Sequence, residues 1–118
     1  MKNRSFAVRL GFALGGVAHA LRAEHSFRTQ AVAAVAVAAV LFWLRPAPIW
    51  WAVIGLTCAA VLAVELLNTA IEHLADHLHP ELHPTIKIVK DLGAAAVLIL
   101  SIGALVVAAA LLVELRGS

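Results

Sequence analysis

The chain consists of long apolar runs separated by short polar segments, and each run can be compared with the thickness of a lipid bilayer. A helix needs about 20 mostly apolar residues to cross the hydrocarbon core. The clearest run, residues 92–113, carries no charged side chain and is rich in Ala, Val, Leu and Ile. This pattern predicts a transmembrane helix over residues 91–114.

A second apolar run, residues 49–67, follows Pro46 and Pro48. Proline suits a turn and the first turn of a helix, because its φ is already close to helical and its missing N–H would have no partner there. We predict a second transmembrane helix over residues 48–72, with a cytoplasmic extension at its end.

The first apolar run, residues 31–44, is shorter, and its length alone also fits a buried helix of a soluble protein. Arg28 precedes this run and Arg45 follows it. Long Arg side chains can reach the headgroups from within the membrane boundary. We therefore predict a transmembrane helix over residues 29–45.

Residues 4–27 are more polar, yet apolar side chains recur there at intervals of three and four, which indicates one apolar helical face. These side chains are Phe6, Leu10, Leu14, Val17 and Leu21. We predict an amphipathic helix in the membrane interface. A cleaved signal peptide is the alternative, because residues 18–20 have a small-x-small form, but Arg9 interrupts its apolar core.

Basic residues are distributed unequally around the predicted spans. Arg45 and Arg116 lie on one side, and the other seven lie on the opposite side. Cytoplasmic segments carry an excess of Lys and Arg, so we predict a cytoplasmic N-terminus, a cytoplasmic loop over residues 73–90 and an external C-terminus. The seven residues are Lys2, Arg4, Arg9, Arg22, Arg28, Lys87 and Lys90.

The composition agrees with a membrane protein. Hydrophobic residues make up 63% and charged residues 14%, against about 45–50% and about 25% in soluble domains. A chain of 118 residues cannot bury that excess in a soluble core. The net charge of +2 is too small for a nucleic-acid binder or a disordered segment. The predicted fold class is an all-α integral membrane protein.

Four polar residues share one face of the predicted second span and its extension. At 100° per residue, Asn68, Glu72 and Asp76 fall within an arc of about 80° around Glu65. An acid inside a membrane helix is a functional candidate, because burying it in lipid is costly. Glu72 and Asp76 alone could also be solvated charges at a helix end. Glu65 and Asn68 have apolar neighbours and point to a site.

Charged residues also stand at the ends of the other two spans. Lys90 and Asp91 precede the third span, where a Lys is often only a topology anchor. Glu24 precedes the first span and could form an i,i+4 pair with Arg28. These residues are candidates for the same site as the acidic face.

Two other chemistries are disfavoured. His73 and His77 are spaced i,i+4, but no His-Glu-x-x-His motif and no nearby cysteine accompany them as zinc ligands. Neither of two glycine-rich nucleotide-binding motifs, Gly-x-x-x-x-Gly-Lys-Ser/Thr and Gly-x-Gly-x-x-Gly, occurs in the sequence. Phosphate binding would therefore have to use a metal ion and basic side chains.

Three segments resemble the small prokaryotic diacylglycerol kinase and undecaprenol kinase family. They are residues 65–76 (ELLNTAIEHLAD), residues 90–97 (KDLGAAAV) and residues 24–28 (EHSFR). The resemblance covers nearly the whole chain, including the order of interfacial helix and three spans. It implies a homotrimer in the bacterial inner membrane that transfers the γ-phosphate of ATP to a lipid alcohol with Mg²⁺, in sites shared between subunits.

The resemblance also implies roles for single residues. Glu65 matches the catalytic base and Asn68 a neighbouring polar residue of the active site, so both would lie at the hydroxyl of the lipid substrate. Glu24 and Glu72 match the metal-binding acids of the family. This chain has Gln30 where the diacylglycerol kinase branch has a further glutamate, so a metal-binding role at that position is in doubt.

The remaining matched residues belong to the nucleotide. Lys90 and Asp91 match a Lys-Asp pair that holds nucleotide. Asp76 closes the signature helix, and His83 matches a loop residue near the nucleotide.

The acceptor lipid is left open between two alcohols. The form of residues 65–73 and the His83-Pro84 pair are closer to the undecaprenol kinase branch, whereas residues 90–98 are closer to the diacylglycerol kinase branch. We lean slightly to undecaprenol. The alternatives to a kinase are a small transporter or proton channel with Glu65 and Asn68 as ion site, and a scaffold subunit without chemistry.

Overall fold

The computed structural model describes residues 3–81 and 83–117, so Lys2 of the predicted charge asymmetry lies outside the described residues. In this part of the chain all regular secondary structure is helical. The helices are α1 (Phe6–Ala23), α2 (His25–Leu44), α3 (Pro48–Leu78) and α4 (Pro84–Gly117). The prediction of an all-α protein is confirmed.

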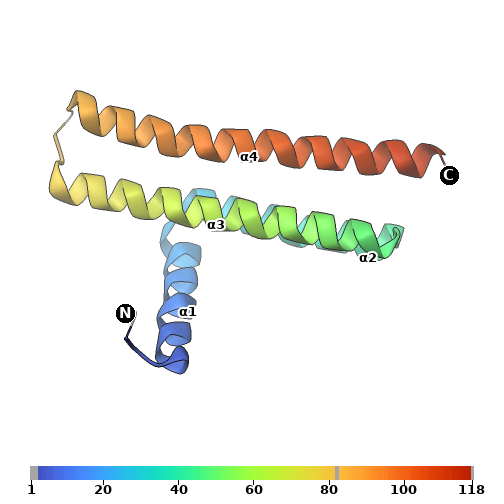
Figure 1. Ribbon diagram of the computed structural model, residues 1–118, viewed down its shortest axis with the longest axis horizontal. Helices are drawn as coiled ribbons and strands as arrows, with labels where there is room; N and C mark the ends of the chain where they lie inside the picture. The colour runs from blue at the N-terminus through green and yellow to red at the C-terminus, as the bar shows by residue number, and fades with distance from the viewer. Residues whose placement is uncertain (1–2, 82, 118) are drawn as a thin grey trace.

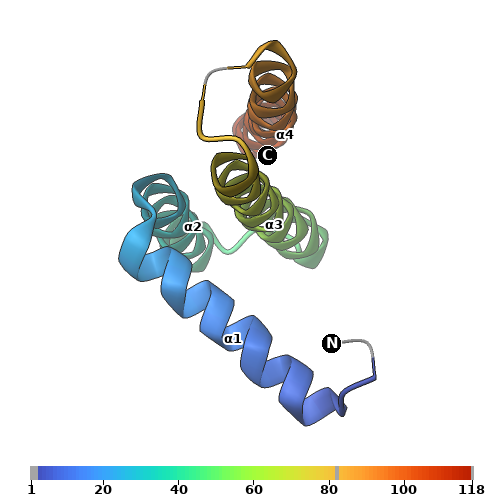
Figure 2. The same ribbon diagram turned by 90° about the vertical axis from the view of Figure 1, so that its left-hand side faces the viewer.

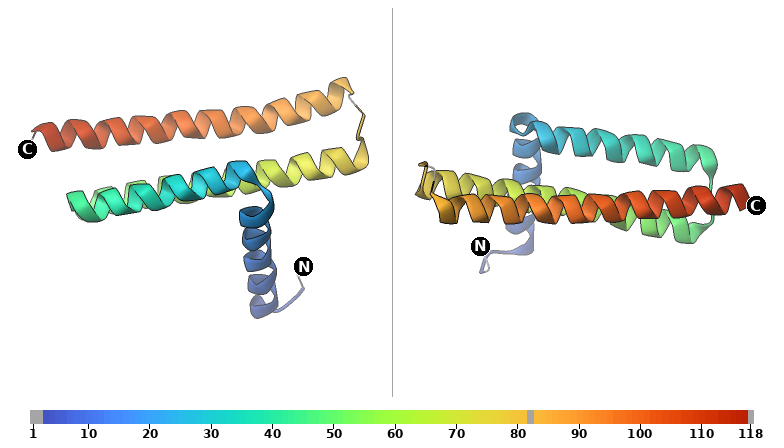
Figure 3. Two further views of the ribbon diagram at one scale, coloured as in Figure 1. Left: turned by 180° about the vertical axis from the view of Figure 1, so that it is seen from behind. Right: turned by 90° about the horizontal axis from the view of Figure 1, so that it is seen from above.

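Three of the helices run side by side and the first crosses them. Helix α3 packs against both α2 and α4, and α1 leaves the start of α2 at a steep angle (Figures 1 and 2). The 45–47 connection and the C-terminal end of α4 lie at one end of the bundle, and the connection between α3 and α4 lies at the other (Figures 1 and 3).

Helices α2, α3 and α4 are each long and apolar enough to cross a membrane. The prediction of three spanning helices is thereby confirmed by length and composition. Little of their apolar windows is buried inside one chain. Large side chains such as Val35, Leu98 and Leu105 are more than half exposed, so this surface needs lipid or neighbouring protein to cover it.

The two longest helices exceed what a bilayer requires. At about 1.5 Å per residue, the 31 residues of α3 and the 34 residues of α4 extend well beyond a hydrocarbon core about 30 Å thick. With their extra turns, both helices continue beyond the start of α2 to the end of the bundle where α3 connects to α4 (Figure 3). Polar residues on those turns can therefore lie outside the hydrocarbon.

A single residue separates α1 from α2. Glu24 has an extended backbone and serves as C-cap of α1 and N-cap of α2. The side chain of Arg28 secures this corner, because its Nη1 donates to the carbonyls of Leu21 at 3.3 Å and Arg22 at 2.8 Å. A cation beside the last carbonyls of a helix is favourable, since those groups have no partners within the helix.

Helix α1 covers most of the region predicted as an interfacial helix over residues 4–27. The predicted apolar face is largely uncovered: Phe6 is 76% exposed and Leu14 61%. Ser5 caps the helix by accepting a hydrogen bond from the N–H of Val8 at 3.4 Å. The structure establishes a helix here; the amphipathic, interfacial role stays a prediction.

The turn between α2 and α3 lies beside the main apolar cluster. Arg45 ends α2 in the left-handed region with φ of 48°, and Pro48 occupies the first turn of α3. The cluster joins Leu41 of α2, Ile54 of α3 and Leu111 of α4, all buried.

The predicted loop over residues 73–90 is mostly helical, and this expectation was wrong in extent. Helix α3 continues to Leu78 and α4 begins at Pro84, which leaves residues 79–83 as the connection. Two prolines explain the limits. His79, which precedes Pro80, is kept out of the helical region by the proline ring, and Pro84 suits the first turn of α4.

Candidate functional site

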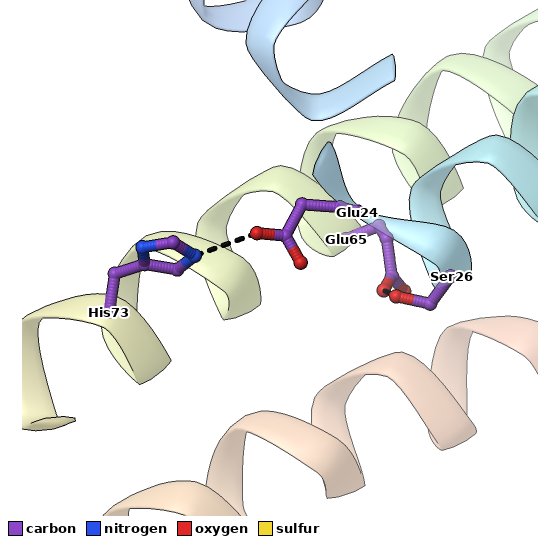
Figure 4. A network of polar contacts seen from close by, with 4 residues as sticks. All are labelled: Glu24, Ser26, Glu65 and His73. Atoms are coloured by element: carbon purple, nitrogen blue, oxygen red, sulfur yellow. Dashed lines mark hydrogen bonds and ion pairs between the residues drawn. The ribbon is translucent and has the colours of Figure 1, made fainter. Parts of the chain in front are cut away.

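A buried carboxylate lies between the helices, at the start of the predicted acidic face. Glu65 is only 5% exposed, and it is the one polar or charged side chain that is buried among the described residues. Its Oε1 accepts a hydrogen bond of 2.6 Å from the hydroxyl of Ser26, at the start of α2 (Figure 4). Burial of an acid is costly unless it is paired, so this contact is part of what allows it.

One turn later on α3, Asn68 faces α4. A methyl group added to Gly93 would overlap its Oδ1. The Oδ1 atom is itself buried and has no hydrogen-bond partner in the described part of the chain. Gly93 thus makes room for the side chain of Asn68, and a buried oxygen without a hydrogen-bond partner is a candidate for contact with a ligand.

The corner between α1 and α2 is tied to α3 by a hydrogen-bonded contact between two side chains. His73 Nε2 lies 2.7 Å from Glu24 Oε1 (Figure 4). The ring of His19 lies edge-on to that of His73. Glu24 therefore does not form the i,i+4 pair with Arg28 that was one alternative, since Arg28 bonds backbone carbonyls instead. The contact brings Glu24 to the same side of α3 as Glu65 (Figure 4).

Further along the acidic face, α3 and α4 are joined by an ion pair. Lys90 Nζ lies 2.5 Å from Asp76 Oδ1. Glu72 is half-buried one turn before Asp76. The hydrogen bond with Asp76 raises the pKa of Lys90, and the negative charge of Glu72 raises it further. The predicted face of α3 is thus in contact with α2 at Glu65 and with α4 at Asn68 and Asp76.

The last two predicted residues lie at the exposed end. Asp91 pairs with Lys87 within α4, at 2.6 Å. His83 accepts a hydrogen bond of 3.0 Å from the N–H of Thr85 and stacks at a tilt with His79. A pocket of about 220 Å³ at this end includes Lys87, Lys90 and Asp91 in its lining but not His83.

An apolar groove of about 680 Å³ lies between α1 and α3. Gly16 and Ala20 line it from α1, and Leu67 and Ala70 from α3. His73, which pairs with Glu24, also lines this groove. An apolar chain in the groove would therefore lie close to the polar contacts of the α1–α2 corner.

The carboxylates of Glu24 and Glu72 suit Mg²⁺ better than zinc. Magnesium takes oxygen ligands and commonly uses one or two carboxylates together with phosphate oxygens. Within residues 3–81 and 83–117, no three His, Cys, Asp or Glu side chains gather as a metal site. Glu24 and Glu72 could therefore supply two carboxylate ligands, and a bound phosphate would supply the others.

The sequence matches a known family over most of its length. Residues 11–112 match the family described as "Prokaryotic diacylglycerol kinase". The chain belongs to this family. The resemblance inferred from the three sequence segments is confirmed, and with it the prediction of an enzyme of the lipid kinase class.

The relatives include an undecaprenol kinase as well as diacylglycerol kinases. The undecaprenol kinase of Bacillus subtilis is 37% identical over 87 residues, which cover 74% of this chain and 71% of that protein. The diacylglycerol kinase of Synechocystis is 37% identical over 106 residues, covering 89% of this chain and 61% of that protein. The diacylglycerol kinase of Escherichia coli is 33% identical over 96 residues, covering 81% and 79%. These relatives do not favour the transporter alternative.

Sequence reasoning missed two contributors to this site. Ser26 was quoted only as part of a matched segment, and nothing in its spacing indicates a contact with a residue 39 positions away. Gly93 likewise stood within a matched segment without a role. The glycine could have been suspected, because glycine is favoured where another group approaches the backbone closely.

Proposed function

We propose that this protein transfers the γ-phosphate of ATP to the primary hydroxyl of a membrane lipid alcohol, with Mg²⁺, at the cytoplasmic face of the bacterial inner membrane. The observation that carries the proposal is the buried carboxylate of Glu65, one turn before the unpaired amide oxygen of Asn68, on a helix whose following turns carry Glu72 and Asp76. A lipid hydroxyl and a water-soluble nucleotide need such a continuous polar path between them.

The reaction can be written on these residues. Glu65 takes the proton from the acceptor hydroxyl while the hydroxyl oxygen forms a bond to the γ-phosphorus. The bond between that phosphorus and the oxygen of ADP breaks, which leaves lipid phosphate and ADP. A positioned carboxylate contributes about 10²–10⁴-fold to such a step. The amide of Asn68 orients the hydroxyl or the carboxylate.

The nucleotide is assigned to the exposed end of the acidic face. We place its phosphates near Lys90 and Asp91, with Asp76 holding Lys90 and His83 at the α3–α4 connection. Glu24 and Glu72 would hold Mg²⁺, which neutralises phosphate charge in transfer reactions of this kind. The chain itself supplies the oxygen ligands and a fixed lysine charge.

We further propose a homotrimer whose sites are shared between subunits. The largely exposed apolar surface of α2, α3 and α4 supports it, since one chain buries little of that surface. For the topology, the basic residues support a cytoplasmic N-terminus and 79–83 connection and an external C-terminus. The connection between α3 and α4 and the C-terminal end of α4 lie at opposite ends of the bundle, as this topology requires (Figure 1).

The acceptor is proposed to be undecaprenol or diacylglycerol, with a slight preference for undecaprenol. Purified protein in lipid nanodiscs should transfer label from γ-labelled ATP to one of these two alcohols and require Mg²⁺. Lipid extraction and chromatography would identify the product, and a methyl ether of each alcohol serves as control. Absence of labelled lipid with both alcohols would contradict the proposed function.

A further inference from the structure

The carboxylate of Glu65 is held by a hydroxyl to which the family resemblance assigned no role. Ser26 is the second residue of α2, and its Oγ donates to Glu65 Oε1 at 2.6 Å (Figure 4). A hydroxyl in the first turn of a helix commonly bonds to nearby backbone of its own chain segment. Here it reaches across to α3 instead.

A neighbouring hydroxyl on the same helix shows the more local behaviour. Thr29 donates to the backbone carbonyl of His25, four residues earlier, at 3.1 Å. The contact of Ser26 is therefore particular to that residue and not a general property of this end of α2.

The geometry leaves the carboxylate half engaged. Oε1 accepts from Ser26, whereas Oε2 accepts no hydrogen bond from any residue the structure describes. A short O–H···O⁻ bond is a strong, charge-assisted one. It restricts rotation of the carboxylate and leaves one oxygen available for a substrate hydroxyl.

We propose that Ser26 is a positioning residue that orients Glu65 for proton removal from the acceptor hydroxyl. This inference rests on the proposed function. Ser26 lies two residues after Glu24, on the segment that His73 ties to α3. The same turn therefore carries a candidate metal ligand and the hydroxyl that sets the orientation of the base.

A set of matched variants tests this role. Ser26→Ala removes the hydroxyl, Ser26→Thr keeps it, and Thr29→Val removes a nearby hydroxyl that does not contact Glu65. Phosphate transfer to the accepted lipid is measured at varied ATP and lipid, with the oligomeric state checked by size-exclusion chromatography. We expect Ser26→Ala to lower kcat about 10- to 100-fold, with KM for both substrates changed by less than about twofold.

The other variants make the result specific. Ser26→Thr should restore kcat to within about threefold of the unsubstituted protein, and Thr29→Val should leave it unchanged. An unaltered kcat in Ser26→Ala, or equal losses in Ser26→Ala and Ser26→Thr, would overturn the positioning role. A change confined to KM would also overturn it, because a misoriented base affects the chemical step and not binding.

Failure of this inference can be told apart from failure of the proposed function. If Glu65→Gln is inactive while Ser26→Ala is fully active, only the role of Ser26 is wrong. If Glu65→Gln itself transfers phosphate normally, the role proposed for Glu65 is wrong, and the inference about Ser26 falls with it.

Discussion

The two ends of the helix bundle are held together by different interactions. At the end with the 45–47 turn, Leu41, Ile54 and Leu111 pack as an apolar cluster, and Trp50 donates to Glu114 at its edge. At the other end Phe27 and Ala75 are also buried, and polar side chains join the helices in addition: Ser26 with Glu65, Glu24 with His73, and Lys90 with Asp76.

This difference suggests that the apolar end mainly stabilises the bundle, whereas the other end positions the groups of the candidate site. Apolar packing is non-directional and depends on buried area, so the first end can hold the helices without orienting any group. Hydrogen bonds and ion pairs have defined geometry and contribute less net stability when exposed. The second end therefore suits a site whose groups have to be oriented, and the four predictions below test that division.

The largest effect is expected from the buried acid. Glu65→Gln keeps the size of the side chain but removes the base, so we expect turnover to be abolished, a loss of about 10²–10⁴-fold. Glu114→Gln at the apolar end is the control and should retain activity. The measurement is labelled phosphate transfer, with size-exclusion chromatography to verify the assembly. Robust activity of Glu65→Gln would remove this residue from the base role.

A somewhat smaller effect is expected where α4 approaches Asn68. Gly93→Ala adds a methyl group that overlaps the amide, so Asn68 has to move and kcat should fall about tenfold or more. Gly103→Ala on the same helix meets nothing within 4 Å and serves as control. Equal activity of the two alanine variants would show that the position of Asn68 does not matter.

Next in size is the metal requirement. Glu24→Ala or Glu72→Ala removes one proposed oxygen ligand, so the Mg²⁺ concentration for half-maximal activity should rise about tenfold. Activity is titrated with Mg²⁺ at constant ATP, with Glu114→Gln again as control. An unchanged titration curve in both variants would count against their role as ligands.

The smallest effect on activity is expected at the apolar end. Leu111→Ala removes a buried side chain, which we expect to lower the free energy of unfolding by about 2 kcal/mol or more. Turnover per folded molecule should stay within about twofold of the unsubstituted protein. Denaturant unfolding and kinetics on the folded fraction measure the two quantities. A tenfold loss of specific turnover with unchanged stability would refute the division between the two ends.

Much of this architecture was accessible from hydropathy and proline positions. The uncharged run over residues 92–113 and the prolines at 46 and 48 indicated helices that the structure contains. The connection between α3 and α4 is shorter than the predicted loop over residues 73–90, because polar side chains also occur on the solvent-facing turns of a helix. Pro80 and Pro84 in fact limit the connection, and the polar turns before and after them stay helical.

The candidate site, too, was only partly predictable from the sequence. The sequence alone determined that Glu65, Asn68, Glu72 and Asp76 share a helical face, because a regular period of 3.6 residues relates positions within one helix. Only the tertiary structure decided that Ser26 holds Glu65, that Gly93 admits Asn68, and that Asp76 meets Lys90. Contacts between helices depend on their relative rotation and translation, and no spacing along a single chain segment encodes those quantities.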